Sequence, residues 1–417
     1  MWVRKEIEIG PGDLLRGWID CCATTSRAEL TRRVADAFGG SQSVPCLSVR
    51  SGFDALLASS GWPPQSEIIL SGLTIPDMPR IVCERGFQPV GVDLQIDSLA
   101  PDPEQVRRAI TPRTKAIVVA HLFGGLIDIE PLAAVAREHG LWLIEDCAQA
   151  YVGNHYTGDS RADVSMFSFG PIKTNTALGG GVFVVRQPAI FEALQRAQQQ
   201  FPLQSRWGFA KRLLKYSYVR GLSTRWIAGA IATSLRWLGS DHDHLATNMA
   251  RGFPGPKFFQ KIRQQPSVPL LSMLNRKLHS FSERYIQHRT ARGNQAASRL
   301  SSRVDVLGSQ MLRPTYWVLP ILVDHRRSLV EQLWRLGFDA TTSSSLKPVG
   351  QDLSRTGCGT TLPNCQFILD HLVFLPFDIS IPDSQVDLMV RTILQGEFAR
   401  PKRPTGHPVE PVAAGTR

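Results

Sequence analysis

A single lysine stands between an apolar run and three glycines in the stretch SMFSFGPIKTNTALGGG, residues 165–181. Lys173 follows Ser168 by five residues and precedes Gly179, Gly180 and Gly181. A charged lysine is costly to bury in such apolar surroundings. The side chain therefore either extends its ammonium group to solvent or serves as a desolvated amine whose neutral form attacks a carbonyl.

A carboxylate and an amide occur in a second stretch, LIEDCAQA, where Asp146 closes an apolar run and Gln149 follows it. Pyridoxal 5′-phosphate needs partners of these types. A lysine holds the cofactor as a Schiff base, and a carboxylate keeps its pyridine nitrogen protonated. Hydroxyls such as that of Ser168, together with N–H groups at a helix start, hold its phosphate. Asp146 and Ser168 also have plainer interpretations, as a turn cap and an ordinary strand residue. His121, at the end of another apolar run, is either a packed histidine or a catalytic one.

Short apolar runs alternate with helix-like stretches from residue 44 to residue 186. The runs read as buried strands, and PEQVRRAI and IEPLAAVAREHG between them read as helices, the latter ending at a glycine. This alternation predicts a mostly parallel sheet covered on both faces, with ligands beyond the carboxyl ends of its strands. The predicted strands cover residues 67–70, 89–93, 116–120, 142–146, 164–169 and 181–185.

The alternation of apolar runs with helix-like stretches ends near residue 200, which predicts further structural units beyond it. We expect a large α/β domain over residues 1–200, a basic and tryptophan-containing insert over 201–270, a smaller α+β domain over 271–399, and a disordered tail over 400–417. In the smaller domain, one long helix is expected from residue 276. A strand over 316–324, a helix over 326–338 and a last helix near 382–395 are expected to follow it.

The net charge of +11 is concentrated in two segments. Residues 200–240 contain seven lysines and arginines and no acid, and the tail adds a net +3, so the remainder is nearly neutral. This distribution argues against a protein built throughout to bind nucleic acid. Seven scattered cysteines indicate reduced thiols rather than a disulfide framework or a metal site. The charged start MWVRKEIEIG does not resemble a signal peptide, so a cytoplasmic location is expected.

Four segments resemble the DegT/DnrJ/StrS family of pyridoxal-phosphate-dependent sugar aminotransferases: RSGFDALLASS, ITPRTKAIVVAHLFG, GLWLIEDCAQAYVG and SFGPIKTNTALGGG. The resemblance is good over residues 44–186 and weaker over 270–397, and it implies the fold-type-I architecture. It makes Lys173 the Schiff-base lysine and Asp146 the partner of the pyridine nitrogen. It assigns the remaining cofactor contacts to Gln149 at the ring hydroxyl, Ser168 at the phosphate, and Ser51 and Gly52 at the helix-start phosphate site.

Three positions depart from the pattern of this family. Phe53 stands where a phosphate-binding threonine is usual, and Ile75 stands where an aromatic ring usually covers the cofactor. The asparagine-arginine motif that reaches the partner subunit's active site survives only as LNRKL, which makes Asn275 its candidate.

The resemblance implies a homodimer that moves an amino group from an amino acid, glutamate, to a keto-sugar carrying a nucleoside diphosphate. A dehydratase of the same family would carry histidine in place of Lys173, so the lysine counts against a dehydratase. A membrane-associated enzyme acting on a lipid-linked acceptor and a non-enzymatic scaffold are also compatible with the sequence. Within the insert, residues 206–238 combine cations with Trp207, Trp226 and Trp237. This combination suits a lid or dimer contact, a helix at a membrane interface, or a cationic wall for a diphosphate.

Overall fold

The computed structural model describes residues 1–2, 7–222, 253, 255–308, 311–342, 345–350 and 361–404. The middle of the predicted insert, with Trp226 and Trp237, lies outside these ranges, and so does the predicted tail beyond residue 404.

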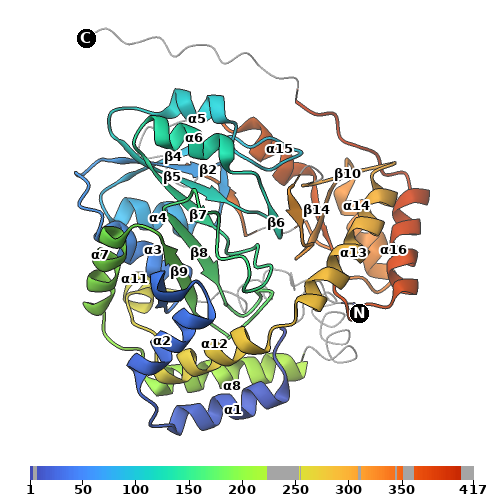
Figure 1. The fold of residues 1–417 in the computed structure, drawn as a ribbon. Coiled ribbons are helices and arrows are strands. Elements are labelled where there is room, and N and C mark those ends of the chain that lie inside the picture. The colour runs from blue at the N-terminus through green and yellow to red at the C-terminus, as the bar shows by residue number, and fades with distance from the viewer. Residues whose placement is uncertain are drawn as a thin grey trace.

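Seven strands form a central sheet in which β9 alone runs against its neighbours. Five adjacent strands are parallel to one another, which confirms the predicted, mostly parallel sheet (Figure 1). In spatial order the strands are β1 (Ser43–Cys46), β9 (Gly181–Val185), β8 (Val164–Ser168), β7 (Trp142–Asp146), β5 (Thr114–Ala120), β2 (Glu67–Ser71) and β4 (Gln88–Val92).

Both faces of this sheet are buried under helices, because successive strand residues point to opposite sides. Ile68 and Leu70 belong to the core on one face, and Ile69 belongs to the core on the other. The first face packs against α3 (Val49–Ala58), α4 (Asp77–Glu84) and α7 (Pro188–Gln199), and the second against α5 (Pro103–Ala109) and α6 (Glu130–Glu138). The glycine predicted to end α6 does so, since Gly140 adopts φ 62° just beyond it.

Four further helices pack at the β8–β9 end of the sheet: α1 (Pro11–Cys22), α2 (Arg27–Ala37), α8 (Arg206–Leu222) and α12 (Val268–Ser280). At the lower edge of Figure 1, α12 contacts α1, α2 and α8. The single long helix expected from residue 276 is wrong. The backbone becomes extended at Phe281, with φ −67° and ψ 129°, so α12 ends there and α13 (Glu283–Leu300) starts separately.

A smaller unit is built on a three-stranded antiparallel sheet, β10 (Asp305–Val306), β12 (Leu319–Leu322) and β14 (Leu372–Leu375). Its core packs against α13, α14 (Arg326–Arg335) and α16 (Asp383–Gln395). Short elements complete the described chain: η1 (Gly40–Gln42), α11 (Phe258–Ile262) and α15 (Pro363–His371).

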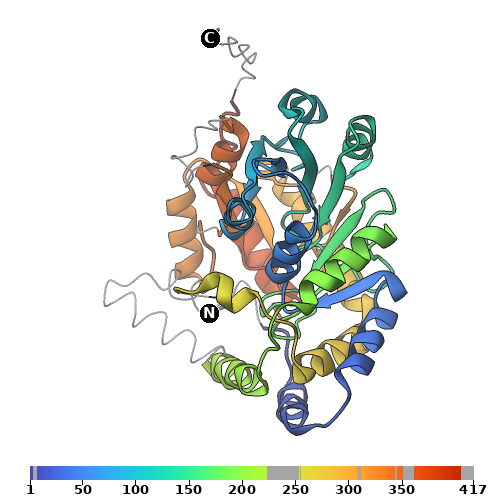
Figure 2. The same ribbon diagram turned by 90° about the vertical axis from the view of Figure 1, so that its left-hand side faces the viewer.

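Two short strand pairs join the smaller unit to segments that connect the strands of the large sheet. β11 (Arg313–Pro314) pairs with β6 (Gly125–Leu126), and β13 (Lys347–Pro348) pairs with β3 (Leu73–Thr74). The start of the predicted tail also contacts the body, because Arg403 forms ion pairs with Asp97 and Asp305. Figure 2 shows the two units seen from the side.

Candidate active site

The carboxyl ends of β5, β7 and β8 meet at one edge of the central sheet. Ala120 lies opposite Asp146, and Asp146 lies opposite Met166, in the registers of the two strand pairs. His121 therefore leaves β5 at the edge where Asp146 ends β7, and Ser168 ends β8 just beyond it. Parallel strands bring such end residues together because their carboxyl termini share an edge.

Lys173 returns to this edge through a tight turn after β8. The Lys173 N–H donates to the Gly170 carbonyl over 3.1 Å. A methyl group built on Gly170 would lie 3.6 Å from Ser168 Oγ and 3.8 Å from Lys173 Cγ. The hydroxyl and the lysine stem therefore flank the same side of Gly170, and two of the predicted site residues lie close together.

Asp146 is held in an environment that favours a cationic partner. Burial raises the pKa of the Asp146 carboxyl, while the hydrogen bond from the Ala148 N–H over 2.9 Å and the positive charge of Lys173 act in the opposite direction. A carboxylate that loses water on burial regains its ionised state when an opposite charge is placed beside it. The side chain is thus suited to holding a protonated ring nitrogen.

Gln149 is oriented by the loop that follows β5. Its Oε1 accepts a hydrogen bond from the Phe123 N–H over 3.0 Å. Because the carbonyl oxygen of the amide is engaged there, Nε2 is the group left to donate to a ligand. Phe123 adopts φ 57°, an uncommon conformation for a residue with a Cβ, which places its N–H toward Gln149.

The glycines after Lys173 allow two close approaches and one left-handed backbone conformation. A Cβ on Gly181 would lie 2.8 Å from the backbone nitrogen of Val49, so only glycine lets β9 begin against the first turn of α3. A Cβ on Gly179 would lie 2.4 Å from Nη1 of Arg212, and Gly180 adopts φ 92°. The glycine run therefore packs the loop after the lysine against the start of α3 and against α8.

The start of α3 offers N–H groups, but its predicted side chains are partly engaged. Ser48 caps the helix by accepting from the Ser51 N–H over 3.2 Å, and the Ser51 hydroxyl donates to the Gln264 carbonyl over 3.2 Å. Gly52 donates its N–H to the Ser48 carbonyl, and a Cβ there would lie 2.1 Å from the Phe183 ring. Because the N–H groups of Ser51 and Gly52 are engaged in this way, those of Val49 and Arg50 in the first turn are the better anion ligands at this position.

The departures Phe53 and Ile75 have different structural settings. Phe53 is fully buried in the core beneath the first sheet face, so it supplies packing where the family has a hydroxyl. Ile75 lies just before α4, partly buried against the same core. Its role as a cofactor cover stays a prediction.

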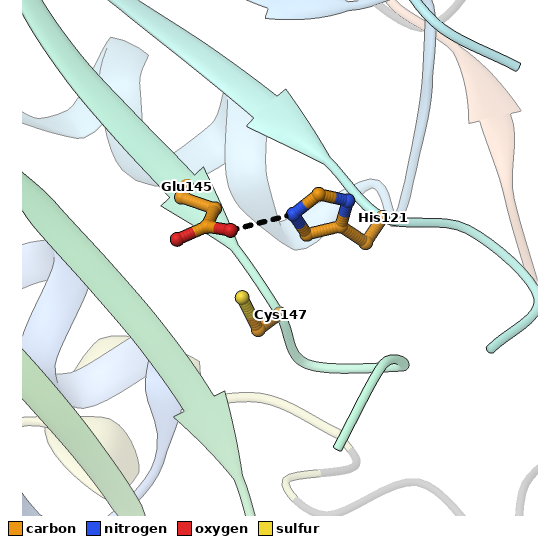
Figure 3. A group of neighbouring side chains, drawn as sticks. All are labelled: His121, Glu145 and Cys147. Atoms are coloured by element: carbon orange, nitrogen blue, oxygen red, sulfur yellow. Dashed lines mark hydrogen bonds and ion pairs between the residues drawn. The ribbon is translucent and has the colours of Figure 1, made fainter. Parts of the chain in front are cut away.

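A buried acid, Glu145, accepts hydrogen bonds from several segments around the site (Figure 3). One carboxylate oxygen of Glu145 accepts from His121 Nε2 over 2.8 Å and from the Tyr156 hydroxyl. The other accepts from the Ser165 hydroxyl over 2.6 Å and from the Asp159 N–H over 2.9 Å. Burial alone would raise the pKa of Glu145, but these donors outweigh it and lower the pKa to about 2.

His121 is a packed residue that supports the site rather than a base within it. Its Nδ1 accepts the Ile127 N–H over 3.1 Å, so Nε2 carries the proton that is donated to Glu145. Ligand atoms of His121, Glu145 and Cys147 lie within 4.8 Å of one another (Figure 3). Both ring nitrogens and both carboxylate oxygens are already hydrogen-bonded, and burial raises the pKa of the Cys147 thiol, so the group is poorly suited to bind a metal ion.

The smaller unit covers the lysine from the other side. The Trp317 Nε1–H donates to the Ile172 carbonyl over 3.0 Å, and Lys173 Nζ lies 4.8 Å from the Trp317 ring centre. Arg289 of α13 is 1 % exposed, donates to the Thr315 carbonyl over 2.7 Å and reaches Thr174 Oγ1 at 3.3 Å. These contacts hold the segment on both sides of Lys173.

Asn275 lies in a different hollow of the protomer, of about 640 Å³, lined by residues of α1, α2 and α12: Asp13, Arg16, Arg33, Asp36, Asn275, Arg276, His279 and Ser280. None of the residues gathered around Lys173 lines this hollow. A contact from Asn275 to a partner's site therefore stays a prediction.

Sequence reasoning missed four contributors: Glu145, Trp317, Arg289 and Arg212. Glu145 had a signal, since a buried strand that ends in two acids must pair or hydrogen-bond both. Trp317 and Arg289 had no signal in the sequence, because their contacts cross between the two units. Arg212 donates to the Leu178 carbonyl over 3.2 Å, a contact that its place in a basic segment did not indicate.

Residues 16–211 match the DegT/DnrJ/EryC1/StrS aminotransferase family, which confirms the resemblance inferred from the motifs. A pleiotropic regulatory protein of Geobacillus stearothermophilus is 34% identical over 157 residues, which are 36% of this chain and 42% of that protein. The match thus spans less than half the length of this relative.

Solved structures share the fold over nearly the whole chain. The aminotransferase TlmJ of Streptoalloteichus hindustanus superposes with a TM-score of 0.69 at 19% identity, covering 94% of this chain and 98% of TlmJ. DesI, solved in the presence of its TDP-sugar product, superposes with a TM-score of 0.66 at 21% identity, covering 94% of this chain and 92% of DesI. The expected architecture of a large parallel-sheet domain and a smaller domain is confirmed.

Proposed function

We propose that this chain is an aminotransferase dependent on pyridoxal 5′-phosphate, because residues 16–211 match the DegT/DnrJ/EryC1/StrS aminotransferase family. It moves an amino group from an amino acid, glutamate, to the keto group of a sugar. The observation that carries the proposal is the placement of Lys173 beside Ser168 at the sheet edge where Asp146 ends β7.

The residues at this edge fit pyridoxal 5′-phosphate group by group. Lys173 supplies the amine for the aldehyde, and Asp146 supplies the anion for the ring nitrogen. Gln149 retains an amide donor for the ring hydroxyl, because its oxygen is held by Phe123. Ser168 and the first turn of α3 supply a hydroxyl and N–H donors for the phosphate.

When bound, the cofactor supplies a reactive aldehyde carbon and a ring that accepts electrons. Lys173 would hold the cofactor at rest. Once freed by the amino donor, its Nζ would act as a general base on the proton of the donor's α-carbon and, in the second half-reaction, as a general acid toward the sugar carbon that receives the amino group. Asp146 would hold the ring nitrogen, and the positive charge of Lys173 beside it favours the ionised form of its carboxyl.

We propose a nucleoside-diphosphate-linked keto-sugar as the acceptor, and a homodimer as the working form. The acceptor is supported by DesI, which shares the fold and was solved with a TDP-sugar product, and by the family resemblance of the motifs. One cation of α8, Arg212, reaches the loop after Lys173, which is compatible with an anionic substrate.

The proposal is tested by incubating the cofactor-loaded protein with glutamate labelled at its amino nitrogen and a panel of keto-sugar nucleotides and lipid-linked keto-sugars. Mass spectrometry should find the label on a sugar nucleotide, and the Lys173→Ala protein should transfer none. Label found only on a lipid-linked sugar would show that the acceptor is lipid-linked rather than nucleotide-linked, while the amino-transfer reaction would stand. No labelled sugar, together with no cofactor absorbance in the purified protein, would contradict the enzyme assignment.

A further inference from the structure

Two neighbouring helices, α1 and α8, leave apolar side chains exposed along one edge of the molecule. They lie side by side at the bottom of Figure 1, and Figure 2 shows the same pair nearly along the helix axes. On α1, Leu15, Trp18 and Ile19 are 64%, 38% and 62% exposed. Residues three and four apart share a helix face, so these three form one stripe.

α8 carries a matching stripe that is more basic. Trp207, Leu214 and Tyr218 are 66%, 63% and 67% exposed, and exposed Lys211 completes their helical spacing. The buried residues of the same helix fix it to the body: Phe209, Leu213 and Tyr216. The outward direction of the stripe is therefore set by packing on the opposite face of α8.

A glycine keeps the two helices together. A Cβ on Gly17 of α1 would lie 2.8 Å from both Leu213 of α8 and Met273 of α12. The absence of a side chain there lets α1 seat against both helices. The two stripes are thus parts of one surface, which we call the α1–α8 surface: Leu15, Trp18, Ile19, Trp207, Lys211, Leu214 and Tyr218.

The charge around the α1–α8 surface is positive. The two acids of α1 are paired within the chain, Asp13 with Lys277 at 3.3 Å and Asp20 with Arg276 at 2.5 Å. These acids are therefore neutralised from the inner side and do not offset the cations of α8. That helix contains no acid and five cations, Arg206, Lys211, Arg212, Lys215 and Arg220, of which Arg212 points inward to the Leu178 carbonyl and the other four remain to give the helix its positive charge.

We propose that the α1–α8 surface docks on an anionic lipid membrane. Leucine and isoleucine would enter the boundary between headgroups and acyl chains, tryptophan and tyrosine suit the headgroup level, and lysine attracts anionic lipid. Among the described residues, no helix has the length and apolarity needed to cross a bilayer.

The charge pattern favours a membrane over a second copy of this chain. A two-fold contact places the same patch of both subunits face to face. Lys211 and its neighbours on α8 would then approach their own copies with no acid of α8 to separate them. An anionic lipid surface meets the same cations with opposite charge. Membrane docking by this surface does not depend on the proposed reaction.

Sedimentation of the full-length protein with lipid vesicles tests membrane docking. The protein should co-sediment with phosphatidylcholine vesicles that contain phosphatidylglycerol and far less with phosphatidylcholine alone, and added salt should release it. The Lys211→Gln variant should bind about fivefold more weakly, in line with one cation near an anionic surface. Ile19→Ser and Leu214→Ser should each weaken binding about tenfold.

Two matched variants serve as controls. Leu312 is 69% exposed but lies away from α1 and α8, so Leu312→Ser should bind as the wild type does. Lys402→Gln removes an exposed cation elsewhere and should also change little. Circular dichroism should show all variants folded, because the changed side chains point to solvent.

Two outcomes would overturn membrane docking. One is no binding to anionic vesicles by the wild type. The other is a change in oligomeric state, measured by light scattering, when Ile19 or Leu214 is replaced, with vesicle binding unaffected. That second result would assign the surface to contact between copies of the chain.

Discussion

The Nζ of Lys173 lies 4.8 Å from the centre of the Trp317 ring, and the same tryptophan donates its Nε1–H to the carbonyl of Ile172. A residue of the smaller unit therefore holds the lysine's backbone and covers its amine at once. An aromatic face attracts a cationic amine and limits its access to water. The contact explains how one lysine is kept in place in a loop rich in glycine.

Replacing Trp317 separates these two contributions. Trp317→Phe keeps a ring beside Lys173 but loses the hydrogen bond to Ile172, and cofactor affinity should fall about fivefold. Trp317→Leu loses the ring as well, and its cofactor affinity should fall by about tenfold or more. Absorbance titration with the cofactor measures both. Trp334→Phe loses a comparable bond, to the Ala340 carbonyl at 3.2 Å, far from the site and should leave affinity unchanged.

Lys173 should be the residue that binds the cofactor covalently. Borohydride reduction followed by peptide mapping should place the pyridoxyl group on Lys173, because its amine is gathered with Ser168 and Asp146 at the sheet edge. Lys173→Ala should abolish amino transfer, since both attachment and proton movement need the amine. Lys115→Ala, on β5, should remain active. A label on any other lysine would show that the site assignment is wrong.

Asp146→Asn should leave the cofactor bound and slow the proton-transfer step. An amide cannot keep the ring nitrogen protonated, and the loss of a charged hydrogen bond corresponds to a rate decrease of about tenfold to a hundredfold. Stopped-flow absorbance during the donor half-reaction measures the step directly. Near-normal turnover in this variant would show that Asp146 only caps the turn by accepting the Ala148 N–H.

Glu145 should make the stability of the fold depend on pH in acid. Its pKa is lowered from 4.5 to about 2, so its contribution is complete above pH 4.5 and is lost as the pH falls through 2. The difference corresponds to about 3 kcal/mol in the free energy of unfolding. Denaturant unfolding across this range should show the loss in the wild type and a flatter profile in Glu145→Gln. Glu104→Gln, at an exposed position of α5, should follow the wild type. A wild-type profile in Glu145→Gln would contradict the role of the hydrogen bonds.

Arg289→Met should weaken both the fold and the cofactor site. The change leaves the buried Thr315 carbonyl without its donor, at a cost of about 1–3 kcal/mol. It also removes the contact to Thr174, next to Lys173. Thermal unfolding and cofactor titration should both shift, and Arg289→Lys should restore part of the stability through one donor. Arg284→Met, at an exposed position of the same helix, is the matched control.

The sequence alone determined the elements of the large domain and the residues at their ends. Apolar runs bounded by helix-like stretches are local signals, and the parallel sheet that they predict brings strand ends to one edge. The placement of Asp146 and Ser168 at this edge was predictable for this reason, and Lys173 was a candidate because a lone amine in an apolar and glycine-rich stretch is chemically conspicuous.

Only the tertiary structure decided what surrounds these residues. Trp317 and Arg289 reach the lysine's loop from the smaller unit, and no local pattern encodes a contact between such distant segments. Gly52 and Gly181 are required by the close approach of Phe183 and of the start of α3, which depends on how the elements pack. The break at Phe281 and the joining of α1 with α8 into one exposed surface also follow from packing, because burial is a property of the assembled helices and sheet.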